Sequence, residues 1–394
     1  MLEISFCRIN NKGLRLIAAC CPSLRAVSGC VSGDSVEAIK AICRACPNLL
    51  KLCLYSNYAA HGNEIIETVV QCCPFIEVLP TGGWYFSNTA LDALAYTRHL
   101  KSLKFRSLDN TMSSLAIQHV LQANSNLINI SLLGNCIDSA LVRCIGRSCR
   151  NLKVLKFDKR YCSGVSELAF QGLFRGCSLL EVFRLSQAYQ LSNDTMSTLF
   201  ASCRGLSTLE LFVWPLRDED TTVTEPILNS SYPCLTKLNI SGGGVTDAQL
   251  RSILTHCTNL YEVRLDSCRQ VTDETIITLG LCGCLESLSI ASRGLLTVAC
   301  ILEISLHCTN LKRLRLEGPP INDTVLIQLS VNCPNITELF LRDRDGEITE
   351  ARIVALVQGC TRLRVLKLGD VALTPTIKLL KKGQAYPHIR FIVV

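Results

Sequence analysis

The stretch CTNLYEVRLDSCRQVTD, residues 257–273, decides the fold of this chain, because its apolar residues alternate and the same pattern recurs. Leu260 is followed by Val263 three residues on and by Leu265 five residues on. This alternation predicts a short β-strand whose apolar side chains share one face. Polar residues between them, such as Arg264, are therefore expected on the other face.

The same apolar phrase recurs along the chain. Its first position, called the anchor below, is apolar at fifteen places spaced 24 to 29 residues apart. The anchors are Leu24, Leu49, Ile76, Leu100, Leu127, Leu152, Leu180, Leu206, Leu235, Leu260, Leu285, Leu311, Ile336, Leu363 and Ile389. This period indicates a leucine-rich repeat, in which stacked strand–helix units bury a continuous core. We expect a single α/β solenoid domain over residues 1–394, a right-handed horseshoe with a parallel concave sheet, convex helices and about fifteen repeats.

A helix is expected between consecutive strands. Leu250, Ile253, Leu254 and Cys257 have the spacing of one helical face. Six prolines lie two residues before an anchor, where proline ends a helix. Asp residues such as Asp247 follow a polar residue at the expected helix starts, where Thr or Asp can accept from free amide groups.

Cysteine is abundant, with 24 of 394 residues, and eleven cysteines share one repeat position, three residues before an anchor. They are Cys21, Cys46, Cys73, Cys149, Cys177, Cys203, Cys257, Cys282, Cys308, Cys333 and Cys360. A small apolar thiol suits a tight buried slot. We therefore interpret Cys257 and Cys268 of the opening stretch as neighbours in a buried ladder of cysteines.

At these residues the chain resembles a known family. The phrase Cys-x-x-Leu-x-x-Leu-x-Leu-x-x-Cys-x-x-[Val/Ile]-Thr-Asp, clearest at 257–276 and 333–350, is similar to the cysteine-containing repeat of F-box/leucine-rich-repeat proteins. The resemblance covers the whole chain. It implies that the repeats hold a protein substrate for a Skp–cullin–F-box (SCF) ubiquitin ligase, in ubiquitin-dependent protein catabolism.

The F-box itself is not recognisable in this sequence. Family members carry before the repeats a helical F-box that opens with Leu-Pro and docks the Skp adaptor, whereas Leu79-Pro80 here lies in a repeat. Leu2 and Ile4 match the later positions of the strand phrase. We therefore expect a fragment, a truncated gene model or a repeat-only relative, with the Skp adaptor as a partner only if an F-box precedes Met1.

Few residues suggest chemistry. Cys43-x-x-Cys46 and Cys282-x-Cys284 have zinc-like spacings, but each pair contains a ladder cysteine and lacks a second pair at finger spacing. The run 242–244, Gly-Gly-Gly, could cradle a phosphate, but it lacks the Lys-Ser/Thr of a P-loop, and a tight turn is favoured. The six histidines are scattered. The sequence predicts no catalytic residue, metal or cofactor, and a protein that is not an enzyme.

The residue four positions after each anchor should face the concave surface. From the fourth repeat on, this central row reads Lys104, Ser131, Lys156, Arg184, Glu210, Asn239, Arg264, Ser289, Arg315, Phe340 and Lys367. Six of these eleven residues are basic, and Arg106 and Arg342 lie beside them. The stripe could attract an acidic or phosphorylated partner segment. The alternative, that exposed strands carry charge for solubility, stays open.

Aromatic residues give a second set of candidates for partner binding. Trp84 and Trp214 each follow an anchor by eight residues, and Tyr85 and Phe212 belong to the same strand-exit loops. Large aromatic side chains are favoured contact residues. The alternative is that these rings only cover irregular loops.

The composition limits the class of protein. Apolar residues make up 48%, and the net charge of +7 is too mild to indicate nucleic acid without a basic patch. There is no run of about 18 apolar residues, so no membrane association is expected. The chain also shows no secretory signal, and we expect a reducing compartment, cytoplasmic or nuclear.

Three roles are compatible with these observations. The first is substrate recognition in an SCF ligase, and the second is a repeat-only regulatory binding protein without a ligase. The third is a sensor of inositol phosphate or another small ligand on the basic concave face, which plant relatives of the resembled family suggest. The sequence names neither the partner nor the oligomeric state.

Overall fold

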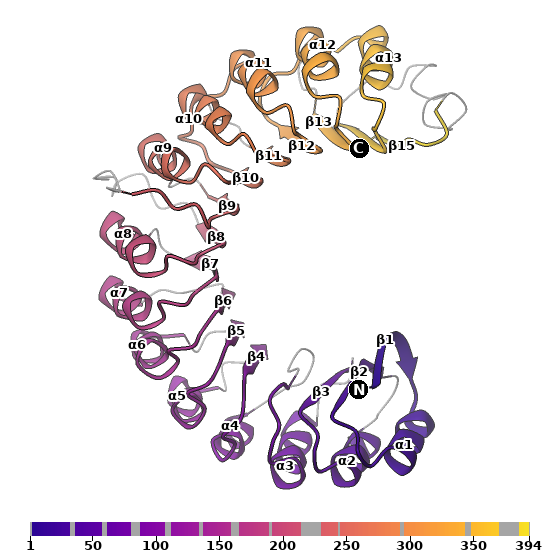
Figure 1. Ribbon diagram of the computed structural model, residues 1–394, viewed down its shortest axis with the longest axis vertical. Helices are drawn as coiled ribbons and strands as arrows, with labels where there is room; N and C mark the ends of the chain where they lie inside the picture. Colours follow the sequence, from indigo (N-terminus) through magenta and orange to yellow (C-terminus); the bar gives the residue numbers. More distant parts are fainter. Residues whose placement is uncertain are drawn as a thin grey trace. The chain divides into compact units, whose positions relative to one another are not determined.

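The computed structural model describes residues 2–31, 36–56, 61–79, 87–106, 112–133, 137–158, 165–188, 191–213, 230–242, 245–291, 295–342, 348–369 and 386–393. The chain divides into two compact units. Unit 1 comprises Met1–Ala188 with Ala201–Leu206, and unit 2 comprises Tyr189–Phe200 with Ser207–Val394. Strands and helices alternate along each unit (Figure 1).

Short strands recur at the predicted phrase. The strands of unit 1 are β1 (Leu2–Ile9), β2 (Ala26–Val31), β3 (Lys51–Ser56), β4 (Ser102–Arg106), β5 (Asn129–Leu133), β6 (Val154–Asp158) and β7 (Val182–Ala188). The strands of unit 2 are β8 (Thr208–Val213), β9 (Lys237–Ser241), β10 (Glu262–Asp266), β11 (Ser287–Ala291), β12 (Arg313–Glu317), β13 (Glu338–Arg342), β14 (Val365–Gly369) and β15 (Arg390–Val393).

Helices of six to eleven residues connect the strands. They are α1 (Asn11–Cys20), α2 (Val36–Ala45), α3 (Gly62–Cys72), α4 (Asn88–Leu94), α5 (Ser114–Ala123), α6 (Ser139–Ser148), α7 (Glu167–Gly176), α8 (Asn193–Ser202), α9 (Asp247–His256), α10 (Asp273–Thr278) with the 3₁₀-helix η1 (Leu279–Leu281), α11 (Val298–His307), α12 (Asp323–Asn332) and α13 (Glu350–Gly359).

Neighbouring strands pair in parallel and in chain order. In unit 2 the order runs from β8 to β15, and Arg264 of β10 lies opposite Ser289 of β11. In unit 1, β1 to β3 and β4 to β7 form the corresponding rows. Val78 of the weak repeat anchored at Ile76 makes only single bridges, to Lys51 and Ser102. This arrangement is the α/β leucine-rich-repeat solenoid that the sequence predicts.

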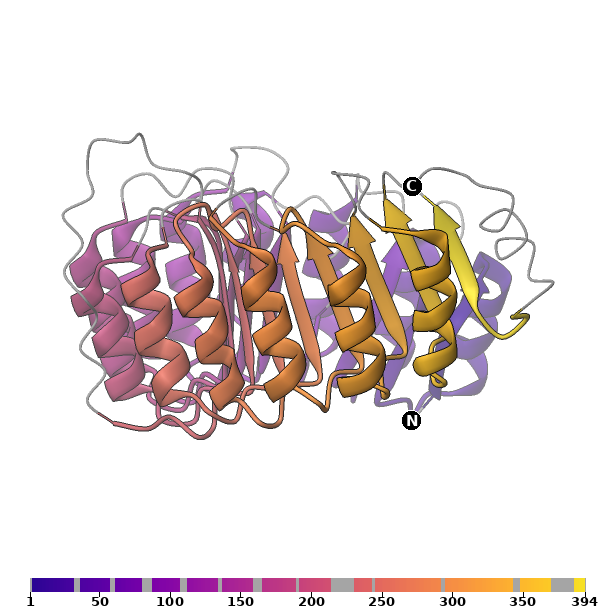
Figure 2. The ribbon, with the colours of Figure 1, turned by 90° about the horizontal axis from the view of Figure 1, so that it is seen from above.

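The core lies between the sheet and the helices of each unit. Leu260, Val263 and Leu265 of the opening stretch are at most 1% exposed, as are most of their equivalents. Burying each such side chain contributes about 1.5–3 kcal/mol, so the repeated phrase supplies a large part of the stability. Figure 2 shows helices α9 to α13 side by side along one side of strands β10 to β15. The opposite side of the sheet, called the open face below, carries the alternate side chains.

The helix starts are joined from repeat to repeat. Thr246 caps α9, and its side chain and that of Gln249 exchange hydrogen bonds with the backbone of the other residue. The Asp247 carboxylate accepts from the backbone N–H of Thr272 at 2.8 Å and from its hydroxyl. Asp273 and Asp323 accept from the next repeat in the same way. Burial alone would raise the pKa of Asp247, but the bonds from Thr272 and Thr275 outweigh it and lower the pKa.

The ladder cysteines lie at the position directly after each helix. Cys257 donates its backbone N–H to Ile253 at 2.9 Å. The thiol of one cysteine then contacts the carbonyl oxygen of the ladder cysteine before it, as with Cys282 and Cys257 at 3.7 Å and Cys177 and Cys149 at 3.4 Å. The thiols therefore add a second contact to carbonyl groups near the helix ends, of which that of Cys149 also accepts from the N–H of Leu152.

Cys257 and Cys268 are both buried, as predicted, but they are not adjacent members of one ladder. Cys257 precedes β10 and Cys268 follows it, so the five residues of the strand, about 16 Å of extended chain, lie between them. The Cys268 thiol instead contacts the carbonyl oxygens of Ile240 and Asp266.

We expect the ladder thiols to resist alkylation in the native protein. Burial raises the pKa of Cys282 to about 11, whereas Cys284, two residues on, is exposed. Because the thiolate is the reactive form, iodoacetamide should modify Cys284 quickly and Cys282 slowly. Peptide mapping by mass spectrometry measures both sites in one peptide, and denatured protein is the control. Equal native rates at the two sites would contradict the buried ladder.

Within the described residues, no helix is long and apolar enough to cross a membrane.

Candidate functional site

Three rows of side chains run across the open face, at two, four and six residues after each anchor. They are called the first, central and last rows. Strand register places the predicted central row in line: Lys104, Ser131, Lys156 and Arg184 in unit 1, and Glu210, Asn239, Arg264, Ser289, Arg315, Phe340 and Lys367 in unit 2. The predicted placement of this row is confirmed within each unit, and its binding role stays a prediction.

In unit 1 the central row is cationic. Lys104 is exposed, and Lys156 and Arg184 are half-buried. Lys156 lies directly opposite Arg184 on neighbouring strands, a like-charge arrangement that destabilises a sheet. The neighbouring first-row residues Val154 and Val182 are uncharged. Arg106 is the last residue of β4, but its side chain lies outside the described part of the chain.

In unit 2 the two central-row arginines are held by carboxylates of their own strands. Arg264 contacts Glu262 at 3.1 Å through Nε and at 2.9 Å through a terminal nitrogen. Arg315 donates to Glu317 at 2.9 Å. Its guanidinium carbon also lies 5.0 Å from the centre of the Phe340 ring, a cation–π arrangement. The stripe in unit 2 is thus compensated in charge, which its basic residues alone did not indicate.

Glu262 is shared among several cations. Its carboxylate lies 3.4 Å from the Lys237 ammonium and 3.9 Å from Arg313, in addition to its contact with Arg264. Its side chain is only 14% exposed. Arg313 also donates to the hydroxyl of Ser287 at 3.2 Å. This cluster fixes the direction of long side chains that would otherwise be free in solvent.

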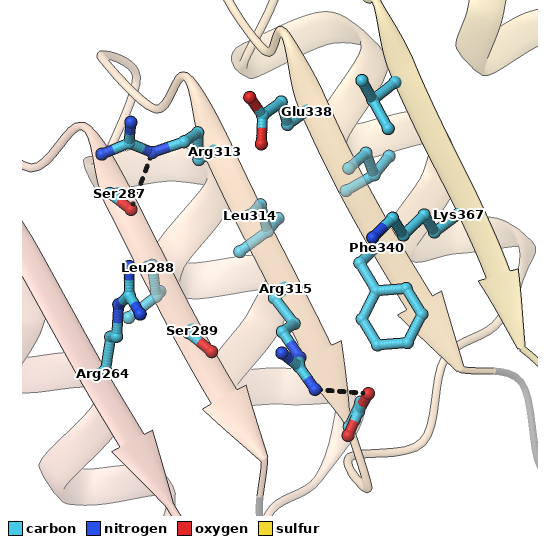
Figure 3. Close-up of a pocket in the computed structure, with 13 residues that line it drawn as sticks. Arg264, Ser287, Leu288, Ser289, Arg313, Leu314, Arg315, Glu338, Phe340 and Lys367 are labelled. Atoms are coloured by element: carbon cyan, nitrogen blue, oxygen red, sulfur yellow. Dashed lines mark hydrogen bonds and ion pairs between the residues drawn. The ribbon is translucent and has the colours of Figure 1, made fainter. Parts of the chain in front are cut away.

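A groove of about 440 Å³ opens across β10 to β14 beside these contacts (Figure 3). Its floor includes Ser287 and Ser289 of β11, and longer side chains stand on both sides. Arg264, Arg313, Arg315 and Lys367 provide the basic residues of its lining, and Glu317 and Glu338 the acidic ones. The groove therefore combines cations, carboxylates and the Phe340 ring.

Lys367 and Arg342 complete the basic candidates of unit 2. Lys367 of β14 is exposed and lies opposite Phe340 in the strand register. Arg342 ends β13 in the last row, is half-buried and lies opposite Gly369. Both side chains belong to the open face, and Lys367 lines the groove.

Carboxylates already crowd the last row of the groove. Burial raises the pKa of Asp266, and the nearby Glu317 raises it further, while Arg315 and Arg264 act in the opposite direction. Asp266 and Glu317 belong to β10 and β12, on either side of β11. Any anion that enters the groove meets these negative charges.

One of the four aromatic candidates can be placed. Phe212 of β8 is half-buried in the last row, opposite Ser241. Trp84, Tyr85 and Trp214 lie outside the described residues, as do most strand-exit loops.

The described residues contain no group of three or more His, Cys, Asp or Glu side chains that could hold a metal ion. Cys43 and Cys46 are buried in the ladder region, and the Cys46 thiol contacts the carbonyl of Cys21 at 3.3 Å. Gly242 has a φ of 130°, the backbone of a turn that glycine adopts readily. The other two glycines of that run are outside the described residues.

Comparison with known proteins gives distant similarities. No protein-family model matches the chain. The chain is 24% identical over 235 residues to a Caenorhabditis elegans protein that carries the provisional name of RNA-binding protein EEED8.10. The match covers 58% of this chain and 27% of that protein, so the chain spans about a quarter of the relative's length.

Two solved structures are similar over nearly the whole chain. Rad7, in the structure of the Rad7 and Elc1 complex in yeast, is 18% identical with a TM-score of 0.46, over 99% of this chain and 80% of that one. A complex of TLR13 with single-stranded RNA is 12% identical with a TM-score of 0.40, over 100% and 68%.

The groove itself was missed in the sequence. Its signal is the set of small residues at alternate positions of β11, Ser287, Ser289 and Ala291, between two strands that carry long charged side chains. Each small residue is ordinary alone, and only the alignment of three consecutive repeats by their anchors reveals the gap.

Proposed function

We propose that this chain is a protein-binding solenoid that recognises a partner through the open face of its sheet, and that it does so as the substrate-recognition part of an SCF ubiquitin ligase. The observation that supports binding is the row of basic side chains on a sheet face that helices leave uncovered. The ligase role rests on the resemblance of residues 257–276 and 333–350 to the cysteine-containing repeat.

The arrangement of charges favours a protein over a nucleic acid as the partner. In unit 2 the arginines Arg264 and Arg315 contact glutamates, and carboxylates line the groove with them. A phosphate backbone would be repelled by these carboxylates, whereas a protein surface can offer charges of both signs. An RNA-binding role, which the name of the worm relative suggests, would fit the cationic central row of unit 1 better than the groove of unit 2.

Reversing charge in both units is expected to weaken partner binding without unfolding the protein. Arg184→Glu together with Arg264→Glu changes two exposed or half-buried central-row residues, so the core stays intact. We expect a loss of affinity of about tenfold or more at moderate salt. Isothermal titration against the partner measures this, and circular dichroism checks the fold. Unchanged affinity would retire the open face as the binding surface.

The ligase role has a separate test. Immunoprecipitation of the full-length protein from its own cells, followed by blotting, should recover the Skp adaptor and a cullin. Absence of both from a precipitate that still contains the substrate partner would overturn the ligase role and leave a repeat-only regulatory protein. A cytoplasmic or nuclear location is part of this proposal, because SCF substrates are met there.

A further inference from the structure

One strand in the groove of unit 2 carries only small side chains on the open face. Ser287, Ser289 and Ala291 of β11 lie in the first, central and last rows. The strands on either side carry Glu262, Arg264 and Asp266 on β10, and Arg313, Arg315 and Glu317 on β12, each opposite one small residue. The height difference forms a trench along β11.

Ion pairs keep the long side chains from closing this trench. Glu262 lies two residues before Arg264 and holds it toward the first row, while Glu317 lies two residues after Arg315 and holds it toward the last row. The two guanidiniums are thus held toward opposite ends of β11, and Ser289 stays half-exposed between them (Figure 3).

We propose that this trench binds an extended acidic segment of a partner protein, whose Glu or Asp carboxylates take the places of Glu262 and Glu317 on Arg264 and Arg315. The inference rests on the proposed function and names the chemistry of its partner. The contacts of Arg264 with Glu262 and of Arg315 with Glu317 are themselves arginine–carboxylate complexes, with donor–acceptor distances of 2.9 to 3.1 Å.

An extended segment matches the spacing of the rows. Rows two residues apart on a strand are about 6.7 Å apart, the same distance that separates alternate side chains of an extended peptide. A segment lying along β11 therefore presents every second side chain to the trench. One acidic side chain can reach Arg264 and Arg313, and another can reach Arg315, while Ser289 offers a hydroxyl between them.

Single-charged carboxylates fit better than phosphate. Glu317 and Glu338 line the groove with the basic residues, and Glu262 contacts Arg264. A group with about two negative charges therefore meets more repulsion there than one with a single charge. Phe340 and Lys367 at the far side of the groove add an apolar surface and an exposed cation.

If partner carboxylates replace those of Glu262 and Glu317, neutralising the two glutamates should strengthen binding. Glu262→Gln with Glu317→Gln keeps the shape and hydrogen-bonding capacity but removes the competing charges. Affinity for an acidic peptide should then rise by about fivefold or more, because the competing carboxylate charges no longer occupy the arginines. Arg264→Ala with Arg315→Ala should lower it by about tenfold or more. A structural role for the glutamates alone would instead lower affinity in both variants.

The probe is a fluorescein-labelled dodecapeptide of alternating Glu and Ser, measured by fluorescence anisotropy with the full chain. Arg251→Ala with Glu274→Gln is the matched control, because this pair, 2.7 Å apart, joins α9 and α10 away from the open face. The control should bind as the unaltered protein does. Thermal unfolding of every variant checks that the fold persists, and the Glu317→Gln single variant repeats the test with the smaller change.

Each outcome decides the proposal. Tighter binding after Glu262→Gln with Glu317→Gln supports it. Unchanged or weaker binding by that variant, or no binding of the acidic peptide by the unaltered protein, overturns it. Tighter binding of the phosphoserine form of the peptide, or of a uridine oligonucleotide of equal length, also overturns it in favour of those ligands. If the acidic peptide fails to bind while Arg184→Glu, which lies outside the trench, still weakens binding of the natural partner, the proposed function survives and only the trench is excluded.

Discussion

Replacing Gly176 with alanine is expected to lower the free energy of unfolding by about 3 kcal/mol or more. Gly176 ends α7, and a Cβ built there would lie 1.9 Å from the carbonyl oxygen of Gly146 in α6. That oxygen belongs to the backbone and cannot rotate away, so the two helices must separate. Separation would open the packing of Phe174, which is fully buried beside Phe183.

A second glycine of the same helix provides the control. A Cβ at Gly172 of α7 meets no atom within 4 Å, and the residue is exposed. Gly172→Ala is therefore expected to stabilise the protein by about 0.5–1 kcal/mol, the difference in helix propensity. Urea unfolding followed by circular dichroism compares the two variants. A Gly176→Ala midpoint equal to that of Gly172→Ala would show that the helices do not approach as closely as described.

The buried half of each repeat could be predicted from the sequence, because burial repeats with the period of the chain. Leu260, Val263 and Leu265 were placed inward by their alternation, and the structure buries all three. The helical face that includes Leu250, Ile253 and Leu254 was found in the same way. The position in the repeat determines that such a residue is apolar and buried, because a closely packed core tolerates few other side chains there.

The charges of the open face could be placed but not paired from the sequence. Arg264 has Glu262 two residues before it and Asp266 two residues after it on the same face. The structure pairs it with Glu262, which also serves Lys237 and Arg313 from the neighbouring strands. Which carboxylate pairs with Arg264 depends on charged side chains from several repeats, and the sequence of one repeat does not show them.

The ladder position also holds two residues that are not cysteine, and the cysteine pattern of the sequence does not reveal them. Thr97 and Asn124 occupy the position of ladder cysteines, three residues before Leu100 and Leu127, and both are at most 5% exposed. Neither is apolar, so an alignment that seeks cysteine passes over them. The structure shows that they belong together.

Thr97 and Asn124 form one buried polar pair in unit 1. The Asn124 side chain accepts from the backbone N–H of Leu100 at 3.1 Å and donates to the carbonyl of Val120 at 3.0 Å. Its amide nitrogen also lies 3.3 Å from the Thr97 hydroxyl, which itself donates to Leu94 at 2.6 Å. In the cysteine repeats the anchor N–H instead donates to the carbonyl of its own ladder residue, as Leu152 does to Cys149.

Asn124→Ala is therefore expected to cost about 3 kcal/mol, because it leaves the buried Leu100 N–H and Thr97 hydroxyl without this partner. Cys149→Ala, at the next ladder position and equally buried, should cost only about 1 kcal/mol, since it mainly removes apolar contact. Urea unfolding measures both. A Cys149→Ala effect as large as that of Asn124→Ala would mean that the thiol matters as much as the polar pair.

A double substitution then tests whether Thr97 and Asn124 depend on each other when they stand in place of two ladder cysteines. Thr97→Cys with Asn124→Cys gives both positions the residue found at the neighbouring ladder positions. There the anchor N–H donates to the carbonyl oxygen of its own ladder residue, as the Leu127 N–H already does to Asn124 at 3.3 Å. The loss in free energy of unfolding in the double variant should be smaller than the sum of the losses in the two single variants by about 1–2 kcal/mol. Strict additivity would instead mean that each residue acts alone. Because the two side chains share a hydrogen bond across the stacked repeats, the physical expectation is coupling, and its size measures how strongly one repeat depends on the next.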